Sequence, residues 1–217
     1  MPTKLPYWRL SGFYFFYFAI VGTLVPYWGP YLHTLGFSAR QVGESIAVIN
    51  LMRVIAPNVL GSLADRRGRR MQLVRLATAL SLLSCVAALI DQSYGWLLLV
   101  MAIFSFLWNG ALPQFEAVTM NHLGARAHRY SRIRLWGSVG FIVAVTVLGG
   151  LVDWAGAGIV PYALLLLSCA LWLSGQVTPE LAAPPVAEPL AGFWQVLRRP
   201  EVLGFLFAAF LSQMSHG

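Results

Sequence analysis

The stretch Gly61-Ser62-Leu63-Ala64-Asp65-Arg66-Arg67-Gly68-Arg69-Arg70 separates two long apolar runs. The first run covers residues 41–63 and the second covers residues 72–90. Runs of this length are long enough to cross the roughly 30 Å hydrocarbon core of a bilayer as helices. A short polar turn between two such helices stays in water, and basic turns favour the cytoplasmic side. The stretch therefore predicts a membrane hairpin whose turn faces the cytoplasm.

The amino-acid composition also indicates a membrane protein. Hydrophobic residues make up 58% of the 217 residues and charged residues only 11%, whereas soluble domains carry about 25% charged residues. The net charge of +7 comes from short turns between apolar runs, which is a topology signal and does not indicate a nucleic-acid surface. We therefore expect the lipid bilayer as the surrounding medium and no nucleic-acid partner.

The apolar runs predict six complete spans. These are expected at residues 10–32, 41–63, 72–90, 96–120, 135–153 and 158–176. Each contains about 18 or more mostly apolar residues, which is enough to span a bilayer, and none shows the polar face of a helix on a soluble protein. The expected fold is an all-α membrane protein in which residues 1–176 form a six-helix transmembrane domain.

Residues 177–200 differ from the rest in composition. Pro179, Pro184, Pro185 and Pro189 are typical of a linker, and residues 193–199 predict a short helix at the membrane interface. A further apolar run covers residues 201–217. We therefore expect a cytoplasmic linker followed by an incomplete seventh transmembrane helix, so that the chain is the first part of a longer membrane protein or a truncated product.

The basic residues are distributed unevenly over the turns. Thirteen of the fifteen lie on the side of the N-terminus: Lys4, Arg9, Arg66, Arg67, Arg69, Arg70, Arg75, Arg126, Arg129, Arg132, Arg134, Arg198 and Arg199. The alternate turns hold Arg40 alone. Because basic residues accumulate on the cytoplasmic side, the expected topology places the N-terminus in the cytoplasm, in a bacterial inner membrane.

The pattern Gly-x-Leu-Ala-Asp-Arg-x-Gly-Arg-Arg at residues 61–70 resembles the signature loop between helices 2 and 3 of major facilitator superfamily transporters. The resemblance implies the N-terminal six-helix bundle of that fold, built as two three-helix repeats, with a C-terminal half as its partner. It also implies a cytoplasmic gate at Gly61, Asp65, Arg66, Gly68 and Arg69. Arg67 and Arg70 are expected to act as topology anchors.

Charged residues inside the spans are candidates for transport, because a charge in hydrocarbon is costly unless it is paired or hydrated. Arg53 lies in the middle of the second span, and Glu116 follows Asn109 in the fourth. Arg132 and Arg134 open the fifth span. Since the fourth and fifth spans form a hairpin, Glu116 and Arg134 reach comparable depths and are placed to form an ion pair. Such a pair either only holds two helices together or takes a direct part in binding the solute or the proton.

Residues 109–117 and 131–141 resemble the helix 4 to helix 5 region of lactose permease-like proton symporters. The pattern Arg-x-Trp-Gly-Ser-x-Gly-Phe at residues 134–141 and the segment Pro-Tyr-Trp at residues 26–28 are similar to the phenylpropionate permease branch of that family. The resemblance implies that Glu116 and Arg134 form a charge pair that contributes to the solute site.

The first span is rich in aromatic residues. Tyr27, Trp28 and Tyr31, near its outer end, are expected in the interfacial belt of the membrane protein. Tyr14, Tyr17 and Phe18 lie deeper in the span. These rings are expected either to pack against other helices or to stack on a ring of the solute, and we include Tyr17 among the candidate site residues.

The sequence contains no nucleotide-binding loop, metal-ligand cluster or nucleophile motif. We therefore expect neither an enzyme nor an ATP-driven pump, and no cofactor or metal. The expected function of the complete protein is proton-coupled uptake of a small organic solute by alternating access. An aromatic acid similar to phenylpropionate is the first expectation, and a sugar or nucleoside is the next. The alternatives are a non-functional half-transporter and a transport-dead membrane sensor with the same fold.

Overall fold

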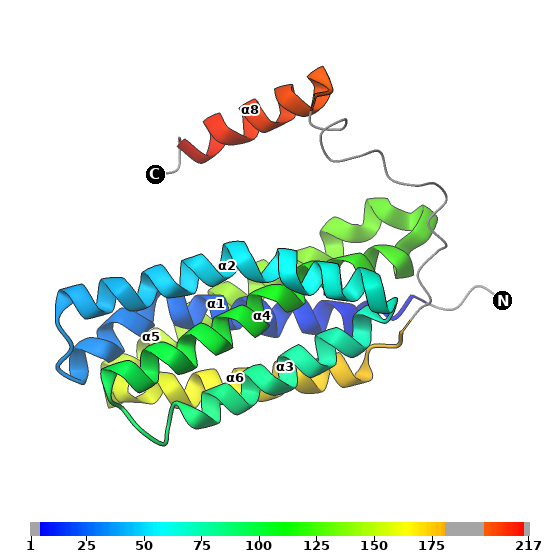
Figure 1. Ribbon diagram of the computed structural model, residues 1–217. Coiled ribbons are helices and arrows are strands. Elements are labelled where there is room, and N and C mark those ends of the chain that lie inside the picture. Colours follow the sequence, from blue (N-terminus) through cyan, green and yellow to red (C-terminus); the bar gives the residue numbers. More distant parts are fainter. Residues whose placement is uncertain (1–4, 181–197, 215–217) are drawn as a thin grey trace. The chain divides into compact units, whose positions relative to one another are not determined.

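The computed structural model describes residues 5–180 and 198–214, and the regular elements within these ranges are helical. They are α1 (Tyr7–Thr34), α2 (Ala39–Arg67), α3 (Arg70–Ala87), α4 (Tyr94–Leu123), η1 (Gly124–Arg129), α5 (Tyr130–Ala155), η2 (Ala157–Ile159), α6 (Val160–Val177) and α8 (Pro200–Met214). The chain divides into two compact units, residues 1–183 and 184–217. The first unit is an up-and-down bundle of α1 to α6 (Figure 1), and the second contains α8.

A helix occupies each of the six predicted spans. The helices α1 to α6 contain between 18 and 30 residues. Apolar windows of membrane-spanning length fall on α1, α2, α3, the continuous stretch of α4 and α5, and α6. The prediction of an all-α membrane protein is therefore confirmed. The predicted linker lies largely outside the described residues, and so does the predicted interfacial helix up to residue 197.

Local sequence determines where α2 begins and ends. The Ser38 hydroxyl accepts the backbone N–H of Gln41 at 3.4 Å, and the Gln41 side-chain oxygen accepts the backbone N–H of Ser38 at 3.0 Å. This reciprocal cap satisfies N–H groups that the first helical turn leaves unpaired. At the other end Gly68 has a φ of 66°, a left-handed conformation that favours glycine. Gly68 therefore ends α2 inside the basic stretch, and α3 begins at Arg70.

The packing of the six helices has an internal two-fold pattern. The main contacts join α1 to α5 and α6, α4 to α2 and α3, and α3 to α6. Exchanging α1 with α4, α2 with α5 and α3 with α6 reproduces the same set of pairs. This is the contact pattern expected of two three-helix repeats in a transporter fold. It makes the α1–α5 contact equivalent to the α4–α2 contact.

Glycines allow close approach at both of these equivalent contacts. A Cβ on Gly22 would lie 2.7 Å from the carbonyl oxygen of Phe141, and one on Gly140 would overlap the carbonyl oxygen of Phe15. In the equivalent pair, a Cβ on Gly110 of α4 would overlap a side chain of α2. Small residues are the usual means by which transmembrane helices bring their backbones together.

Two of the three aromatic residues near the C-terminal end of α1, Trp28 and Tyr31, are buried inside the bundle. Trp28 and Tyr31 are each only 2% exposed, and the Trp28 indole donates a hydrogen bond to the Ser45 hydroxyl at 3.1 Å. The Tyr27 hydroxyl donates to the backbone carbonyl of Val145 at 2.7 Å. The prediction that these rings form an interfacial belt was therefore wrong, because Trp28 and Tyr31 are buried and because Trp28 and Tyr27 join α1 to α2 and α5. Trp8 and Trp154 are the strongly exposed tryptophans of the described chain, at 70% and 84%.

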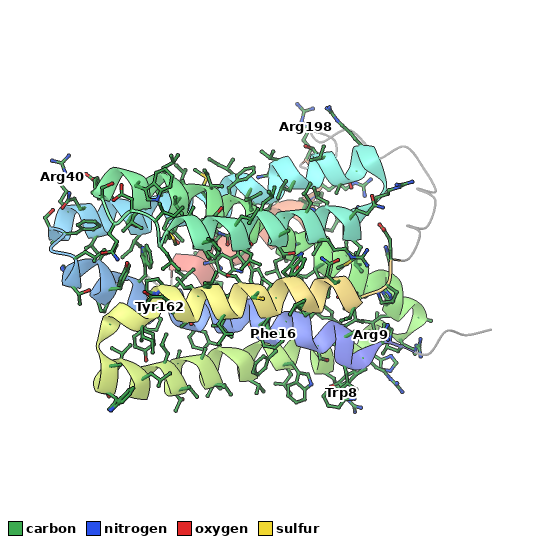
Figure 2. All side chains as sticks on the ribbon, turned by 90° about the horizontal axis from the view of Figure 1, so that it is seen from below. Trp8, Arg9, Phe16, Arg40, Tyr162 and Arg198 are labelled. Atoms are coloured by element: carbon green, nitrogen blue, oxygen red, sulfur yellow. The ribbon has the colours of Figure 1, made fainter. Side chains whose placement is uncertain are left out.

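One end of the bundle carries the basic turns, and we call it the basic end. It contains the α2–α3 turn, η1, the start of α1 and the end of α6. Arg9 of α1 (labelled in Figure 2) donates to the carbonyl of Val177 at 3.2 Å. Arg75 of α3 donates to the carbonyl of Thr178 at 2.7 Å. These two arginines satisfy carbonyl groups that the last turn of α6 leaves without helical partners.

Candidate solute-binding site

A cavity of about 270 Å³ lies between α1, α2 and α4, and we call it the central cavity. It combines aromatic rings, side-chain amides and a guanidinium. Its lining residues are Tyr17, Phe18, Val21, Leu24, Val25, Ile49, Asn50, Arg53, Pro57, Trp108, Asn109, Leu112 and Pro113. The structure therefore brings three of the predicted site residues together here, namely Tyr17, Arg53 and Asn109.

Arg53 supplies the charge of the central cavity. It has equal numbers of α2 residues on either side, so it lies at the middle of that helix. Its side chain is exposed, and it has no ion pair with any of the described residues. The amide nitrogens of Asn50 and Asn109 donate to carbonyls of their own helices, at 3.1 and 2.8 Å. Their amide oxygens are acceptors, whereas Arg53 offers a concentrated group of hydrogen-bond donors.

Aromatic rings form the wall of the cavity between α1 and α4. The Tyr17 and Trp108 rings are stacked, with centroids 4.7 Å apart and an interplanar angle of 18°. Trp108 also stacks on Phe104 at 5.8 Å, and Phe13 stacks on Phe115 at 3.7 Å. Tyr17 is 4% exposed. Each of these rings packs against another ring, so Tyr17 and Trp108 offer the cavity a closely packed apolar wall.

Glu116 and Arg134 do not form the expected ion pair. In the described part of the chain, the ion pairs are Arg40 with Glu44 and Asp65 with Arg70. Glu116 instead accepts a hydrogen bond from the Tyr130 hydroxyl at 3.2 Å. Glu116 and Arg134 were expected at similar depth in a hairpin of the fourth and fifth spans. The turn between these helices contains η1, and Tyr130 at the start of α5 lies within reach of the carboxylate.

The Arg134 guanidinium rests on aromatic rings of α1. Its central carbon lies 3.8 Å from the Phe18 ring centroid and 5.7 Å from that of Tyr14. Gly137, one turn further along α5, makes room for it. A Cβ there would lie 2.6 Å from the Arg134 Nη1 atom and 2.8 Å from the Phe18 ring. Phe18 also lines the central cavity, so a single ring connects the Arg134 site to that cavity.

Arg132 is not part of this arrangement. Its side chain is exposed at the basic end, and its backbone carbonyl accepts a hydrogen bond from the Tyr7 hydroxyl at 3.3 Å. The Trp136 indole donates to the same hydroxyl at 3.0 Å. Arg132 therefore lies where α1 and α5 meet at the basic end, and the structure does not place its side chain in the central cavity.

In the residue 61–70 stretch, the partner of Asp65 is Arg70 and not Arg69. The Arg70 Nη2 atom lies 2.7 Å from the Asp65 Oδ1 atom. Arg69 lines a groove of about 350 Å³ between α2 and α3. Gly61 faces the Gln114 amide of α4, which would lie 3.5 Å from an added Cβ. The side chain of Arg66 is exposed, and Gly68 ends α2.

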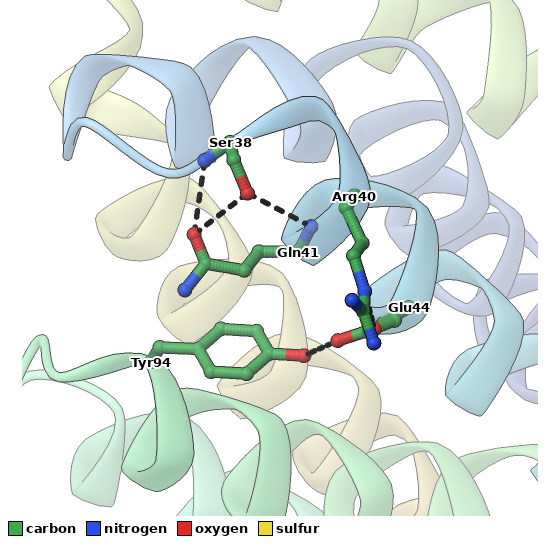
Figure 3. A network of polar contacts seen from close by, with 5 residues as sticks. All are labelled: Ser38, Arg40, Gln41, Glu44 and Tyr94. Atoms are coloured by element: carbon green, nitrogen blue, oxygen red, sulfur yellow. Dashed lines mark hydrogen bonds and ion pairs between the residues drawn. The ribbon is translucent and has the colours of Figure 1, made fainter.

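A second polar network lies at the end opposite the basic end. Glu44 of α2 forms an ion pair with Arg40 at 2.8 Å and accepts a hydrogen bond from the Tyr94 hydroxyl of α4 (Figure 3). This network links the N-terminal ends of α2 and α4 beside the Ser38–Gln41 cap. Its groups are close to the solvent-facing end of both helices, and it does not contact the central cavity.

Sequence reasoning missed two residues of the site, Trp108 and Tyr130, and it did not select Phe18 from the deep aromatic residues of the first span. Trp108 carried a signal, because Phe104 and Trp108 are four residues apart and therefore share one face of α4, next to the predicted residue Asn109. Tyr130 carried none, because its contact with Glu116 depends on the path of η1. Phe18 was one of several aromatic residues in α1, and only the packing of α5 singles it out.

These features define a multi-pass membrane protein with a charged cavity halfway along its helices. The MFS_1 like family matches residues 7–217, and the chain belongs to that family. The resemblance to major facilitator transporters is therefore confirmed.

Two relatives and one solved structure show what this chain is similar to. Over 195 residues it is 27% identical to the maltose permease of Geobacillus stearothermophilus, and the matched region covers 89% of this chain and 48% of that protein. It is 27% identical over 168 residues to the probable 3-phenylpropionic acid transporter of Escherichia coli (strain K12), covering 77% and 44%. The crystal structure of the nucleoside transporter NupG has a similar fold, with a TM-score of 0.77 and 20% identity. The match covers 96% of this chain and 52% of the NupG chain. The chain thus spans about half the length of the relatives it matches.

Proposed function

We propose that this chain forms one half of a secondary active transporter that takes up a small organic solute together with a proton. Membership of the MFS_1 like family and the fold shared with NupG support this function. The partner would be a C-terminal half, which packs on the described bundle and completes the solute pathway. Alternating access then follows from rocking of the two halves around the solute site.

The observation that carries the proposal is the composition of the central cavity. An exposed guanidinium, Arg53, stands opposite a stacked aromatic wall that includes Tyr17 and Trp108. A planar ring with a carboxylate has one apolar part for the wall and one charged part for Arg53. This favours an aromatic acid over a sugar or nucleoside as the first substrate class to test. The printed function of the Escherichia coli relative, a probable 3-phenylpropionic acid transporter, agrees with that class.

Glu116 is the proposed proton-binding residue. It is the acidic residue closest in sequence to the cavity, three positions after the lining residue Pro113. Its described hydrogen-bond partner is the neutral Tyr130 hydroxyl. Glu116 also has no ion pair within the described residues. These two observations support its assignment as the proton-binding residue.

The basic stretch is the proposed gate, formed by Gly61, Asp65, Arg66, Gly68 and Arg69. The Asp65–Arg70 pair holds the start of α3 against the end of α2, so Arg70 joins this proposed group. The positive-inside pattern supports a cytoplasmic location for the basic end and for the N-terminus. A bacterial inner membrane is the proposed location.

Uptake into cells tests the proposed function directly. The native-length protein is expressed in a strain that lacks endogenous uptake, and accumulation of labelled 3-phenylpropionate, maltose and adenosine is measured. We expect accumulation of 3-phenylpropionate that stops when a protonophore removes the proton gradient. Accumulation that persists with the protonophore would contradict proton coupling. If none of the three solutes accumulates above the level of empty-vector cells, the transport proposal fails.

A further inference from the structure

The exposed face of α3, together with its N-cap residue, changes from polar to apolar along the helix. Exposed side chains recur there every three or four residues, at Arg69, Gln72, Leu76, Leu80 and Leu83. This spacing places them in one stripe. At a rise of 1.5 Å per residue the stripe is about 21 Å long, which exceeds the half-thickness of about 15 Å of a hydrocarbon core. The stripe therefore has a charged head at the basic end of the bundle and an apolar tail along a membrane-spanning helix.

The surface beside this stripe is hollowed near both of its ends. The groove of about 350 Å³ that contains Arg69 also includes Gln72 and Leu76. A wider hollow of about 630 Å³ between α2, α3 and α4 includes Leu80 and Leu83. The hollows arise because α2 and α3 both pack mainly on α4 and little on each other. Leu76 and Leu80 are one helical turn apart, so the two hollows follow one another, and we call them together the lateral groove.

One small apolar cluster lies beneath both parts of the lateral groove. Ala64 and Leu73, which line the part at the basic end, belong to this cluster. Phe106 of α4 lines the wider part and packs against the same cluster. The groove is thus open to the surroundings of the bundle and closed below by buried side chains.

Arg69 gives the lateral groove its charge. Its side chain is exposed, and none of the carboxylates in residues 5–180 and 198–214 forms an ion pair with it. Asp65, the acidic residue nearest in sequence, is paired with Arg70. The amide of Gln72 adds a hydrogen-bond donor and an acceptor. Basic pockets between transmembrane helices are typical binding sites for anionic lipid headgroups.

The second three-helix repeat provides an internal comparison. A hollow of about 180 Å³ lies between α1, α5 and α6, which are the equivalents of α4, α2 and α3. It is lined by apolar side chains and by Thr23, whose hydroxyl donates to the Ala19 carbonyl of its own helix. A hollow between these helices therefore follows from the packing of each repeat. The unpaired guanidinium at one end distinguishes the lateral groove.

We propose that the lateral groove binds one anionic phospholipid of the membrane. Its phosphate lies at Arg69 and Gln72, and an acyl chain follows Leu76, Leu80 and Leu83 into the wider hollow. A soluble anion would leave the leucines uncovered, and a neutral lipid would leave Arg69 without a counter-charge. The proposal requires a membrane protein of this fold and does not depend on the solute or on proton coupling.

Native mass spectrometry of the native-length protein, released from nanodiscs with equal amounts of phosphatidylglycerol and phosphatidylcholine, tests the headgroup contact. We expect wild type to retain phosphatidylglycerol in preference to phosphatidylcholine. Arg69→Gln should reduce this preference about fivefold, the scale of one arginine near anionic lipid. Arg132→Gln is the matched control, because Arg132 is exposed at the same end and does not line the groove. Its preference should equal that of wild type.

A second pair of variants tests the acyl-chain path. Ala102→Phe fills the wider part of the lateral groove, and Ala163→Phe makes the same change in the equivalent hollow of the second repeat. We expect Ala102→Phe to lose most of the retained phosphatidylglycerol and Ala163→Phe to keep it. The unfolding midpoint of each variant in detergent shows that the loss does not come from unfolding.

The other outcomes overturn the proposal. Equal retention of the two lipids by wild type, or equal effects of Arg69→Gln and Arg132→Gln, would exclude a headgroup contact at Arg69. Equal retention of phosphatidylglycerol by Ala102→Phe and Ala163→Phe would exclude the acyl-chain path. Release of the lipid by an excess of glycerol 3-phosphate would mean a site for a free anion. If wild type retains no lipid, another protein segment covers the groove.

Discussion

The guanidinium of Arg134 lies 3.8 Å from the centre of the Phe18 ring, and Phe18 lines the central cavity. The first and fifth helices therefore meet at a cation–aromatic contact one ring away from the proposed solute. The ring face stabilises the guanidinium without neutralising its charge. This relationship, together with the Tyr130–Glu116 hydrogen bond, leads to predictions that single substitutions can test.

Replacement of Phe18 by Leu should weaken solute binding without unfolding the protein. Leucine fills similar apolar space but provides no ring face for Arg134, and such a contact contributes about 0.5–2 kcal/mol. We expect a dissociation constant for 3-phenylpropionate that rises several-fold, with thermal stability nearly unchanged. Phe16→Leu is the control, because Phe16 neighbours Phe15 on α1 and does not line the cavity. An equal loss of affinity in both variants would contradict the role of Phe18.

Replacement of Arg53 by Gln should reduce uptake of an anionic solute by about tenfold or more, since a charge-assisted hydrogen bond is roughly twice as strong as a neutral one. Gln keeps a polar side chain, so the amount of protein in the membrane should not change. Arg40→Gln removes an exposed arginine far from the cavity and serves as the control. The measurement is initial uptake rate normalised to membrane protein. Wild-type uptake in Arg53→Gln would remove Arg53 from the site.

Replacement of Glu116 by Gln should separate solute binding from proton coupling. Gln retains an acceptor for the Tyr130 hydroxyl but cannot carry a proton. We expect exchange of labelled for unlabelled solute to continue, whereas accumulation driven by a proton gradient is lost. Proteoliposomes with an imposed pH gradient allow both to be measured. Gradient-driven accumulation at the wild-type rate would assign the proton to another group.

Replacement of Gly140 by Ala should destabilise the bundle. The added Cβ overlaps the backbone carbonyl of Phe15, and a backbone cannot move aside as a side chain can. We expect a loss of about 1–3 kcal/mol, the range for overpacked cores, and a lower unfolding midpoint in detergent. Gly150→Ala lies on the same helix and meets no atom within 4 Å, so its midpoint should not fall. Similar destabilisation in both variants would mean that the α1–α5 approach is not the cause.

Replacement of Arg70 by Gln should lower the transport rate more than replacement of Arg69 by Gln. Arg70 contacts Asp65 at 2.7 Å, whereas Arg69 has no ion pair in the part of the chain that the structure describes. The pair is partly exposed, so the stability change should stay below about 1 kcal/mol. The expected effect is on transport rate, measured with both variants at equal protein level. A larger loss in Arg69→Gln would support the assignment of Arg69 as the principal gate residue.

Local features of this chain could be predicted from its sequence, whereas contacts between distant residues could not. Span positions were predictable because the bilayer sets a minimum length of apolar helix, and the basic stretch marked the hairpin between α2 and α3. The place of Arg53 in a cavity was also predictable, because an intramembrane charge requires a polar environment. The belt assignment of Trp28 failed, since the aromatic periodicity of α1 does not tell which face meets lipid.

The sequence alone determined the class of protein, its six spans, and the charges that lie within them. These features depend on hydropathy and chain-local signals, which act on each helix separately. The tertiary structure decided which groups meet: Arg134 with Phe18, Glu116 with Tyr130, and Asp65 with Arg70. Such pairings depend on helix rotation and on the path of η1, and differences of a few ångströms there decide whether two charges form an ion pair.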